Sequence, residues 1–137
     1  MIEMTQVWER LFIGGHDDAQ RLSQFNPKGI TTVISLFEIS VVRRNTEINY
    51  LHLPIDDAKS ISVGQFDSII DALFENIRWG TVLLHCGSGM SRAPIMAAAW
   101  MHVVGYQKID AALEKIAGMR PIIAPSSILL ASVKECL

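Results

Sequence analysis

Four short apolar runs rich in β-branched residues constrain the fold of this chain more than any other feature. Each run is bounded by Gly, Pro, Asp or polar residues, as strands are. Helical patterns lie between and after the runs. Strands that alternate with helices predict an α/β fold, with a mostly parallel sheet of four to five strands and helices on both faces. The runs are Leu11–Ile13, Ile30–Leu36, Tyr50–Leu53 and Thr81–Leu84.

The helical patterns are clearest in the second half of the chain. Ser62 and Gln65 have capping-box spacing and precede an apolar stripe that predicts a helix ending before Gly80. The residues assigned to the stripe are Val63, Phe66, Ile69, Ile70, Leu73, Phe74 and Ile77. A second helix is predicted over Arg92–Gly105, because Pro94 is tolerated in a first turn. This helix has no polar face, which places it in the interior. Two more helices are predicted at Asp110–Gly118 and Ser127–Glu135.

Composition and charge narrow the function classes. With 137 residues, of which 50% are hydrophobic and 19% charged, the chain is predicted to fold as one domain over residues 1–137. Twelve basic and fourteen acidic residues argue against a nucleic-acid partner. No apolar stretch reaches the roughly 20 residues of a membrane span, so no membrane partner is predicted. Cys86 and Cys136 make no disulfide framework, which favours a reduced, cytoplasmic protein.

The most informative segment joins the last strand to the interior helix. It runs from an apolar strand through small residues into a helix, and in an open α/β sheet that junction lies at the ligand-binding edge. Backbone N–H groups of the loop, together with the helix N-terminus, predict an anion site. The predicted phosphate-binding residues are Gly87, Ser88, Gly89, Met90, Ser91 and Arg92.

Cys86 and Arg92 turn this anion site into a candidate active site. The loop N–H groups would stabilise a Cys86 thiolate, and the planar guanidinium of Arg92 can hold two oxygens of a tetrahedral oxyanion. Free cysteines are more often buried small hydrophobes, and this Cys–Arg spacing also occurs by chance. The strand, glycines and helix around the pair favour the catalytic interpretation. A thiolate beneath a bound phosphate is placed for in-line attack on phosphorus.

The segment from His85 to Arg92 resembles the signature of the protein tyrosine phosphatase superfamily: His-Cys, two residues, Gly, two residues, Arg. The Ser91-Arg92 ending and the short chain resemble its dual-specificity branch, and weaker similarities extend from Arg10 to Pro125. The resemblance implies a phosphatase-like catalytic domain that dephosphorylates phosphotyrosine and phosphoserine or phosphothreonine in proteins through a phosphocysteine intermediate. It implies that His85 supports the loop by hydrogen bonding, and that neither metal nor cofactor is needed.

A general acid is expected on a second loop at the same sheet edge. A strand from Tyr50 ends in two adjacent carboxylates, Asp56 and Asp57, and the resemblance favours Asp57 because it lies seven residues after the tyrosine. Asp56 is the alternative. Either aspartate could instead cap the turn before Ser62, a common role for Asp.

Two positions depart from the family pattern. Ala93 stands where the family usually carries a Ser or Thr whose hydroxyl assists breakdown of the phosphocysteine, which predicts a slow second step. Ser88 or Ser91 are candidates to compensate. Ser126 stands where the family often has Asn, which puts the bracing of the active-site loops in doubt.

The remaining histidines and the second cysteine suggest no further site. His16, His52 and His102 have no partners at metal-ligand spacing and are expected to be surface or satisfied core residues. Cys136 is expected to be inert. The uncharged interior of the loop argues against a highly anionic substrate such as an inositol polyphosphate.

Two other functions remain open. One is a phosphate-binding pseudophosphatase, an interaction module in which Ala93 reflects lost turnover. The other is a thiol-based transferase, such as a sulfurtransferase or an arsenate reductase, for which Cys136 is the sole candidate resolving thiol. The expected partner is a phosphorylated protein, and the sequence does not determine the oligomeric state.

Overall fold

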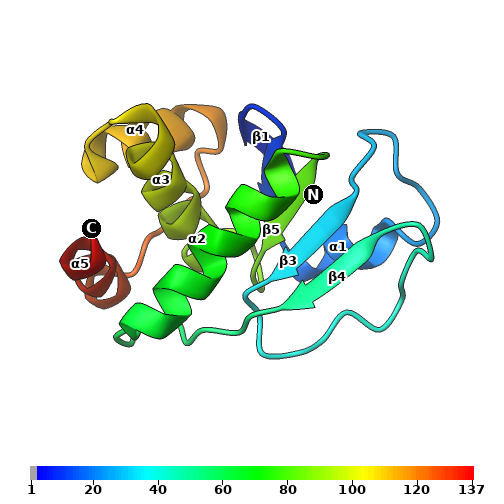
Figure 1. Cartoon of the computed structure of the whole chain (residues 1–137), viewed down its shortest axis with the longest axis horizontal. Helices are drawn as coiled ribbons and strands as arrows, with labels where there is room; N and C mark the ends of the chain where they lie inside the picture. The colour runs from blue at the N-terminus through cyan, green and yellow to red at the C-terminus, as the bar shows by residue number, and fades with distance from the viewer. Residues whose placement is uncertain (1–2) are drawn as a thin grey trace.

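The structure is a computed structural model, and it describes residues 3–137 (Figure 1). A five-stranded sheet lies at its centre, in the order β1-β2-β5-β3-β4. β1 pairs antiparallel with β2, and the other pairs are parallel, which confirms the predicted mostly parallel sheet. The sequence patterns did not reveal β1. The strands are β1 (Thr5–Trp8), β2 (Leu11–Gly14), β3 (Thr32–Ser35), β4 (Asn49–His52) and β5 (Val82–His85).

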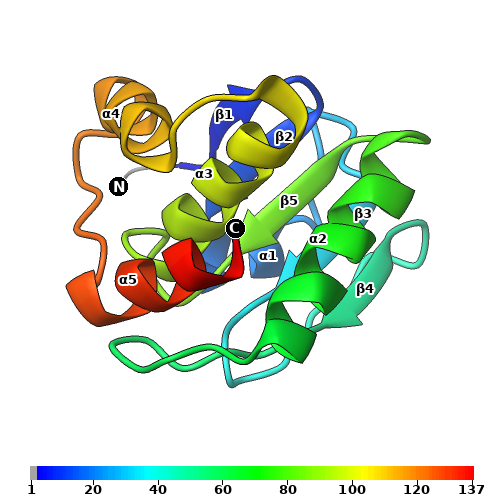
Figure 2. The ribbon, with the colours of Figure 1, turned by 60° about the vertical axis from the view of Figure 1, so that its left-hand side comes forward.

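Helices cover both faces of the sheet, as predicted (Figures 1 and 2). Four helices lie on one face and α1 lies on the other, with α3 packed against α4, α5 and the sheet. No helix within residues 3–137 is long and apolar enough to cross a membrane. The helices are α1 (His16–Arg21), α2 (Val63–Ile77), α3 (Arg92–Gly105), α4 (Ile109–Met119) and α5 (Ser127–Cys136).

The apolar runs of the central strands fill two cores. Successive side chains of a strand point to opposite faces, so a strand covered on both sides must be apolar throughout. Ile34 and Leu84 enter the large core beneath α2 to α5, whereas Val33 and Leu83 enter the smaller core on the α1 side. All four side chains are fully buried. This explains why these strands show continuous rather than alternating hydrophobicity.

The helix boundaries follow the predicted signals closely. Ser62 caps α2 and forms the capping box with Gln65, and α3 spans the predicted residues. The stripe on α2 was assigned too widely, because Val63 is 63% exposed and Phe74 is 48% exposed. Val63 lies in the first turn of α2, beyond the edge of the core. α1 was not predicted, since six residues are too few to show a helical period.

Candidate active site

The predicted site residues meet at one edge of the sheet. Cys86 follows β5, and Asp57 lies on the loop that follows β4. β3 lies between these strands and leads into Phe37 and Glu38 at the same edge. Because the three strands are parallel, their carboxyl ends converge where ligands bind in open α/β sheets.

The loop after Cys86, which we call the phosphate loop (residues 87–91), turns its carbonyl oxygens outward. Backbone amides of His16 and Ala124 donate to the carbonyls of Gly87 and Met90, at 2.9 and 2.7 Å. The amide N–H groups of residues 87–91 donate to no atom within residues 3–137. In a trans peptide the C=O and the following N–H point in opposite directions. Fixing the carbonyls outward therefore turns unpaired N–H donors toward the concave side, which suits an oxyanion.

Arg120 holds the middle of the phosphate loop, and the sequence analysis gave it no role. Its side chain is 1% exposed, and it donates from Nε to the Gly89 carbonyl at 3.0 Å and from Nη2 to the Ser88 carbonyl at 3.2 Å. Nη1 donates to the Thr5 hydroxyl of β1 at 2.9 Å. Burial lowers the pKa of this guanidinium below its ordinary value. Its sequence signal was a lone arginine before Pro121, directly after the apolar face of α4.

Gly89 is required by the shape of the loop. Its φ is +73°, in the left-handed region that favours glycine. A Cβ there would lie 2.7 Å from the Gly14 carbonyl carbon and 2.7 Å from Nη2 of Arg120. A side chain at this position would push the loop away from β2 and from its arginine brace.

Cys86 lies at the base of the phosphate loop, 2% exposed. His85, directly before it, is fully buried, with Nδ1 3.1 Å from the Cys86 carbonyl and Nε2 2.6 Å from the Ser35 hydroxyl. Desolvation lowers the pKa of His85 to about 4, so the ring is neutral near pH 7. A carbonyl only accepts, so Nδ1 carries the proton and Nε2 accepts from Ser35. This arrangement suits a supporting residue rather than a proton carrier.

Arg92, the first residue of α3, is held by two segments, one after β3 and one after β4. Its Nη1 donates to Glu38 Oε2 at 2.8 Å and to the Ile55 carbonyl at 3.1 Å, and its guanidinium lies 5.5 Å from the centre of the Phe37 ring. The hydrogen bond from Arg92 lowers the pKa of the Glu38 carboxyl. Within residues 3–137, Nε and Nη2 of Arg92 have no partner. A Cβ on Gly87 would lie 3.6 Å from Nη2, so these donors border the phosphate loop.

Neither Phe37 nor Glu38 was predicted from the sequence as a site residue. Both follow β3 at the sheet edge where Asp57 was sought after β4. Their position directly after a central strand was a signal that could have identified them, because residues that follow parallel strands meet at one edge of the sheet. No motif marks them, however, because their role depends on the side chain of Arg92 reaching this edge.

Of the two candidate acids, Asp57 faces the phosphate loop. Its Oδ1 accepts a hydrogen bond from the Ser91 hydroxyl at 2.7 Å, and Ser91 Oγ accepts from the Ser126 backbone N–H at 2.9 Å. Within residues 3–137, Asp56 makes no hydrogen bond or ion pair. Within residues 3–137, neither aspartate side chain accepts a hydrogen bond from the turn before Ser62, so neither caps that turn. Ser91 thus joins the acid loop (residues 56–60), the phosphate loop and the start of α5.

The departures from the family pattern have different consequences. Ser126 braces the site through its backbone and caps α5 with its side chain, so this bracing does not require Asn. Ala93 is fully buried and offers no hydroxyl. Ser91 directs its single hydroxyl proton to Asp57. No hydroxyl within residues 3–137 donates to the Cys86 sulfur, so neither Ser88 nor Ser91 compensates in this arrangement.

The remaining histidines and Cys136 lie in different environments. His52 and His102 are hydrogen-bonded. His16 is not a satisfied residue, because its Nδ1 is buried without a partner within residues 3–137, beside the ring of Phe37. Burial raises the pKa of Cys136, which favours its inert thiol form. No cluster of three or more metal-ligating side chains occurs in the described chain.

Comparison with known proteins identifies the family. The family model described as "Dual specificity phosphatase, catalytic domain" matches residues 11–136. The chain belongs to the dual specificity phosphatase family. Members of this protein phosphatase family are hydrolases of phosphoric monoesters, and the family implies phosphoprotein substrates. The match confirms the resemblance found in the sequence.

Individual relatives agree with this dual specificity phosphatase assignment. Dual specificity protein phosphatase 18 of Mus musculus is 30% identical over 129 residues, which cover 90% of this chain and 67% of that protein. This chain covers between 52% and 67% of the mouse and rat dual specificity phosphatases 18 and 15 that it matches.

Solved structures share the fold of this dual specificity phosphatase domain. The crystal structure of DUSP15 superposes with a TM-score of 0.84 at 27% identity, covering 97% of this chain and 86% of that chain. Human tyrosine phosphatase-like serine/threonine/tyrosine-interacting protein superposes with a TM-score of 0.85 at 23% identity, covering 97% of this chain and 94% of that chain. At that identity the likeness shows the fold alone.

Proposed function

We propose that this chain is a cysteine-dependent phosphomonoesterase that removes phosphate from phosphotyrosine and from phosphoserine or phosphothreonine in proteins. The observation that carries the proposal is the phosphate loop, whose carbonyls are held outward while its N–H groups have no partner in the described chain. Cys86 lies at the base of that loop, and Arg92 borders it. This is the arrangement that binds a tetrahedral dianion above a nucleophile.

The first chemical step forms a phosphocysteine. The Cys86 thiolate attacks phosphorus, so that an S–P bond forms as the bond to the leaving oxygen breaks. The N–H groups of residues 87–91 and the free donors of Arg92 bind the three non-bridging oxygens. Asp57 gives its proton to the leaving oxygen. In the second step Asp57 takes a proton from water, which attacks phosphorus and returns the thiolate and inorganic phosphate.

Three contacts support these roles. Asp57 accepts a hydrogen bond from Ser91 of the phosphate loop and Asp56 does not within residues 3–137, which supports Asp57 as the acid. Glu38 and the Ile55 carbonyl both hold one nitrogen of Arg92, which leaves its remaining donors for the substrate. The reaction requires Cys86 as the thiolate and Asp57 with its proton at the same time.

The substrate class follows from the charge and exposure of the site. The phosphate loop carries no charged residue between Cys86 and Arg92, which suits a monophosphate better than a polyphosphorylated inositol. The acid loop is exposed along its whole length, which favours a shallow site open to both aromatic and aliphatic phosphoesters. The proposal treats residues 1–137 as one catalytic domain without metal or cofactor. It places the protein in the cytoplasm, where Cys86 stays reduced.

One observation favours a second candidate, a phosphate-binding module with little turnover. Ala93 leaves the Cys86 sulfur without a hydroxyl donor in the described chain, which would slow breakdown of the phosphocysteine. The fold is compatible with both the enzyme and the binding module, because a human protein named as tyrosine phosphatase-like and interacting shares it. Intact Cys86, Arg92 and Asp57 favour the enzyme.

Hydrolysis of p-nitrophenyl phosphate separates the candidates. We expect steady turnover by the native protein, none by Cys86→Ser, and phosphate binding by both in isothermal titration calorimetry. Binding without turnover in the native protein would contradict the phosphatase and support the module. The Cys136→Ser variant should keep full activity. Loss of activity in this variant would instead point to a thiol transferase in which Cys136 is the resolving cysteine. Ala93→Ser should raise turnover if phosphocysteine breakdown limits the rate.

A further inference from the structure

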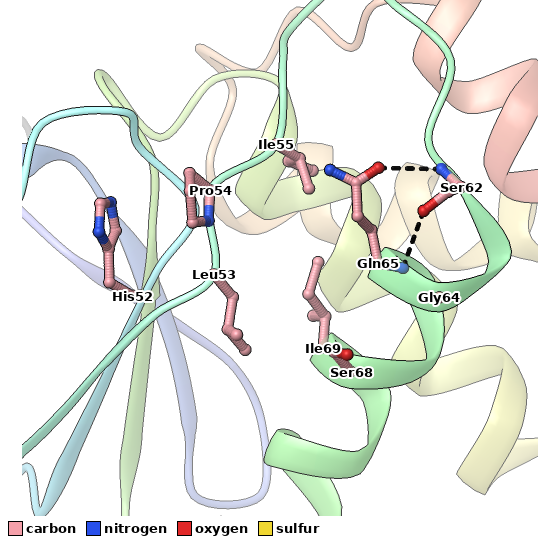
Figure 3. A pocket seen from close by; sticks show the side chains of 9 residues that line it. All are labelled: His52, Leu53, Pro54, Ile55, Ser62, Gly64, Gln65, Ser68 and Ile69. Atoms are coloured by element: carbon pink, nitrogen blue, oxygen red, sulfur yellow. Dashed lines mark hydrogen bonds between the residues drawn. The ribbon is translucent and has the colours of Figure 1, made fainter.

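A second concave site lies behind the acid loop, apart from the phosphate loop (Figure 3). This cavity, which we call the α2 pocket, has a volume of about 450 Å³, within the range of small-molecule sites. It opens between the segment that follows β4 and the first two turns of α2. Its lining comprises His52, Leu53, Pro54, Ile55, Ser62, Gly64, Gln65, Ser68 and Ile69.

The lining selects for a neutral, mostly apolar ligand. It contains no Asp, Glu, Lys or Arg, and apolar side chains form much of the wall. The Oε1 atom of Gln65 accepts from the Ser62 N–H at 3.0 Å, which fixes the orientation of the amide. In Figure 3 the amide nitrogen of Gln65 points across the pocket toward Ile55. It has no partner within residues 3–137, so a hydrogen-bond donor is available to a ligand.

The α2 pocket shares its wall with the supports of Arg92. The carbonyl of Ile55, a lining residue, accepts from Arg92 Nη1 at 3.1 Å. His52, on the opposite side of the pocket, donates from Nε2 to the Phe37 carbonyl at 2.7 Å, and the Phe37 ring lies 5.5 Å from the Arg92 guanidinium. Ile55 is also followed directly by Asp56 and Asp57. Two of the contacts that hold Arg92, and the stem of the acid loop, therefore border this pocket.

We propose that the α2 pocket is a regulatory site for a small, neutral, mostly apolar compound that carries a hydrogen-bond acceptor. A ligand that fits these walls binds the conformation in which Ile55 and Phe37 hold Arg92 and Asp57 meets Ser91. Binding therefore populates that conformation, because a ligand shifts an equilibrium toward the state it binds better. The regulatory effect rests on the proposed phosphatase activity, whereas ligand binding can be measured without it.

Two glycines give matched variants for the test. A Cβ on Gly64 would have Ser62 Oγ, 3.9 Å away, as its nearest neighbour, so Gly64→Leu adds a side chain at the pocket without a clash. A Cβ on Gly118 of α4, outside the pocket, would meet nothing within 4 Å. Leucine improves helix propensity by about 1 kcal/mol at either exposed position, so both variants should fold.

The binding measurement uses indole-3-carboxamide as the probe, with indole-3-carboxylate as its charged counterpart. In amide NMR titrations we expect the carboxamide to shift the signals of Ile55, Gly64 and Ser68 in the native protein. The same residues should respond in Gly118→Leu, whereas Gly64→Leu should not bind. The carboxylate should bind about tenfold more weakly, because its charge loses hydration against a neutral lining. Equal binding by Gly64→Leu, or no binding by the native protein, would overturn the proposal.

The kinetic measurement decides whether the site is regulatory. The carboxamide should raise kcat/KM for p-nitrophenyl phosphate about threefold in the native protein and in Gly118→Leu, but not in Gly64→Leu. Binding with unchanged or lowered activity would overturn the regulatory role. If Gly64→Leu loses activity only on phosphopeptides, the pocket is instead a subsite for a substrate side chain, and the proposal is wrong. Probe binding by a protein without any turnover would contradict the proposed function while supporting the binding site.

Discussion

The two loops that flank the Cys86 sulfur are built in opposite ways. The carbonyls of the phosphate loop are held by α1, by Arg120 and by the segment before α5. The acid loop, residues 56–60, is exposed at every position, and within residues 3–137 its only side-chain hydrogen bond to the phosphate loop runs from Ser91 to Asp57. The difference matches their proposed tasks. Donors that stabilise developing charge act best when preorganised, whereas a proton donor must let substrate enter and product leave.

The acid loop is pinned at its ends rather than along its length. The Ile55 N–H donates to the Leu36 carbonyl at 3.1 Å, and the Ile61 N–H donates to the Ser132 hydroxyl at 2.8 Å. Between these points Ala58 has a φ of +56°, which is unfavourable for a residue with a side chain. We expect the acid loop to move as a unit between two fixed ends.

The largest expected effect comes from removing the brace of the rigid loop. Arg120→Met leaves the Ser88 and Gly89 carbonyls without their donor, so we expect kcat/KM to fall by about 100-fold. The free energy of unfolding should also fall by about 3 kcal/mol, because buried acceptors lose their partners. Steady-state kinetics and urea unfolding measure the two effects. Arg120→Lys keeps the charge but not the planar guanidinium, so its kcat/KM and free energy of unfolding should lie between those of the native protein and Arg120→Met. A kcat/KM within twofold of native in Arg120→Met would show that Arg120 does not brace the loop.

In the acid loop, Asp57→Asn should lower kcat by an amount that depends on the leaving group of the substrate. We expect kcat on alkyl phosphates to fall by about 100-fold, because an alkoxide needs protonation as it departs. The loss should be much smaller on p-nitrophenyl phosphate, whose leaving group departs as a stable anion. Asp56→Asn is the matched control and should retain near-native activity. Equal losses by Asp57→Asn on both substrates would show that Asp57 is not the acid.

The stabilising contribution of neutral His85, which lies at the base of the phosphate loop, should be lost at low pH. The pKa of His85 is lowered from 6.5 to about 4 in the folded protein. As the pH falls, the unfolded chain binds a proton at this histidine before the folded protein does. The contribution of His85 to the free energy of unfolding is therefore fully present above pH 6.5 and declines by up to about 3 kcal/mol as the pH falls toward 4. Urea unfolding at several pH values measures this decline. A His85→Gln variant should show a flatter profile between pH 4 and 6.5, and an identical slope would assign the decline to other groups.

The smallest effect is expected at Ala58, the strained position of the exposed acid loop. Ala58→Gly should raise the free energy of unfolding by under about 1 kcal/mol, because glycine adopts a positive φ without a steric penalty. Lys59→Gly, next to it at an ordinary φ, should lower stability by a similar amount. Urea unfolding compares the two variants directly. A loss of stability in Ala58→Gly would mean that other interactions in the loop outweigh its backbone strain.

The sequence predicted those site residues that lie together in one local segment, and it missed those that reach the site from elsewhere in the chain. Cys86 and Arg92 share one segment, and its strand, glycines and helix were all visible in the sequence. Asp57 was found by a positional argument together with the resemblance. Arg120 was left without a role because it reaches the phosphate loop from 31 residues away in the chain. No periodicity or motif states where such a side chain will point.

The short elements show the same limit. β1 has four residues and pairs with β2 by a hairpin, while α1 has six, so neither carries enough repeats to be recognised. Phe37 and Glu38 lie next to a correctly predicted strand and still escaped notice. Their significance appears only when Arg92 folds back against them.

By itself the sequence determined the order of strands and helices, the buried position of α3 and the pairing of a cysteine with an arginine across a loop. These features depend on contacts between near neighbours in the chain, which periodicity and spacing record. The tertiary structure alone decided which carbonyls are held outward, which aspartate meets Ser91 and which segments hold Arg92. Those contacts join residues far apart in the chain, and their geometry is set by how the helices pack on the sheet rather than by any local pattern.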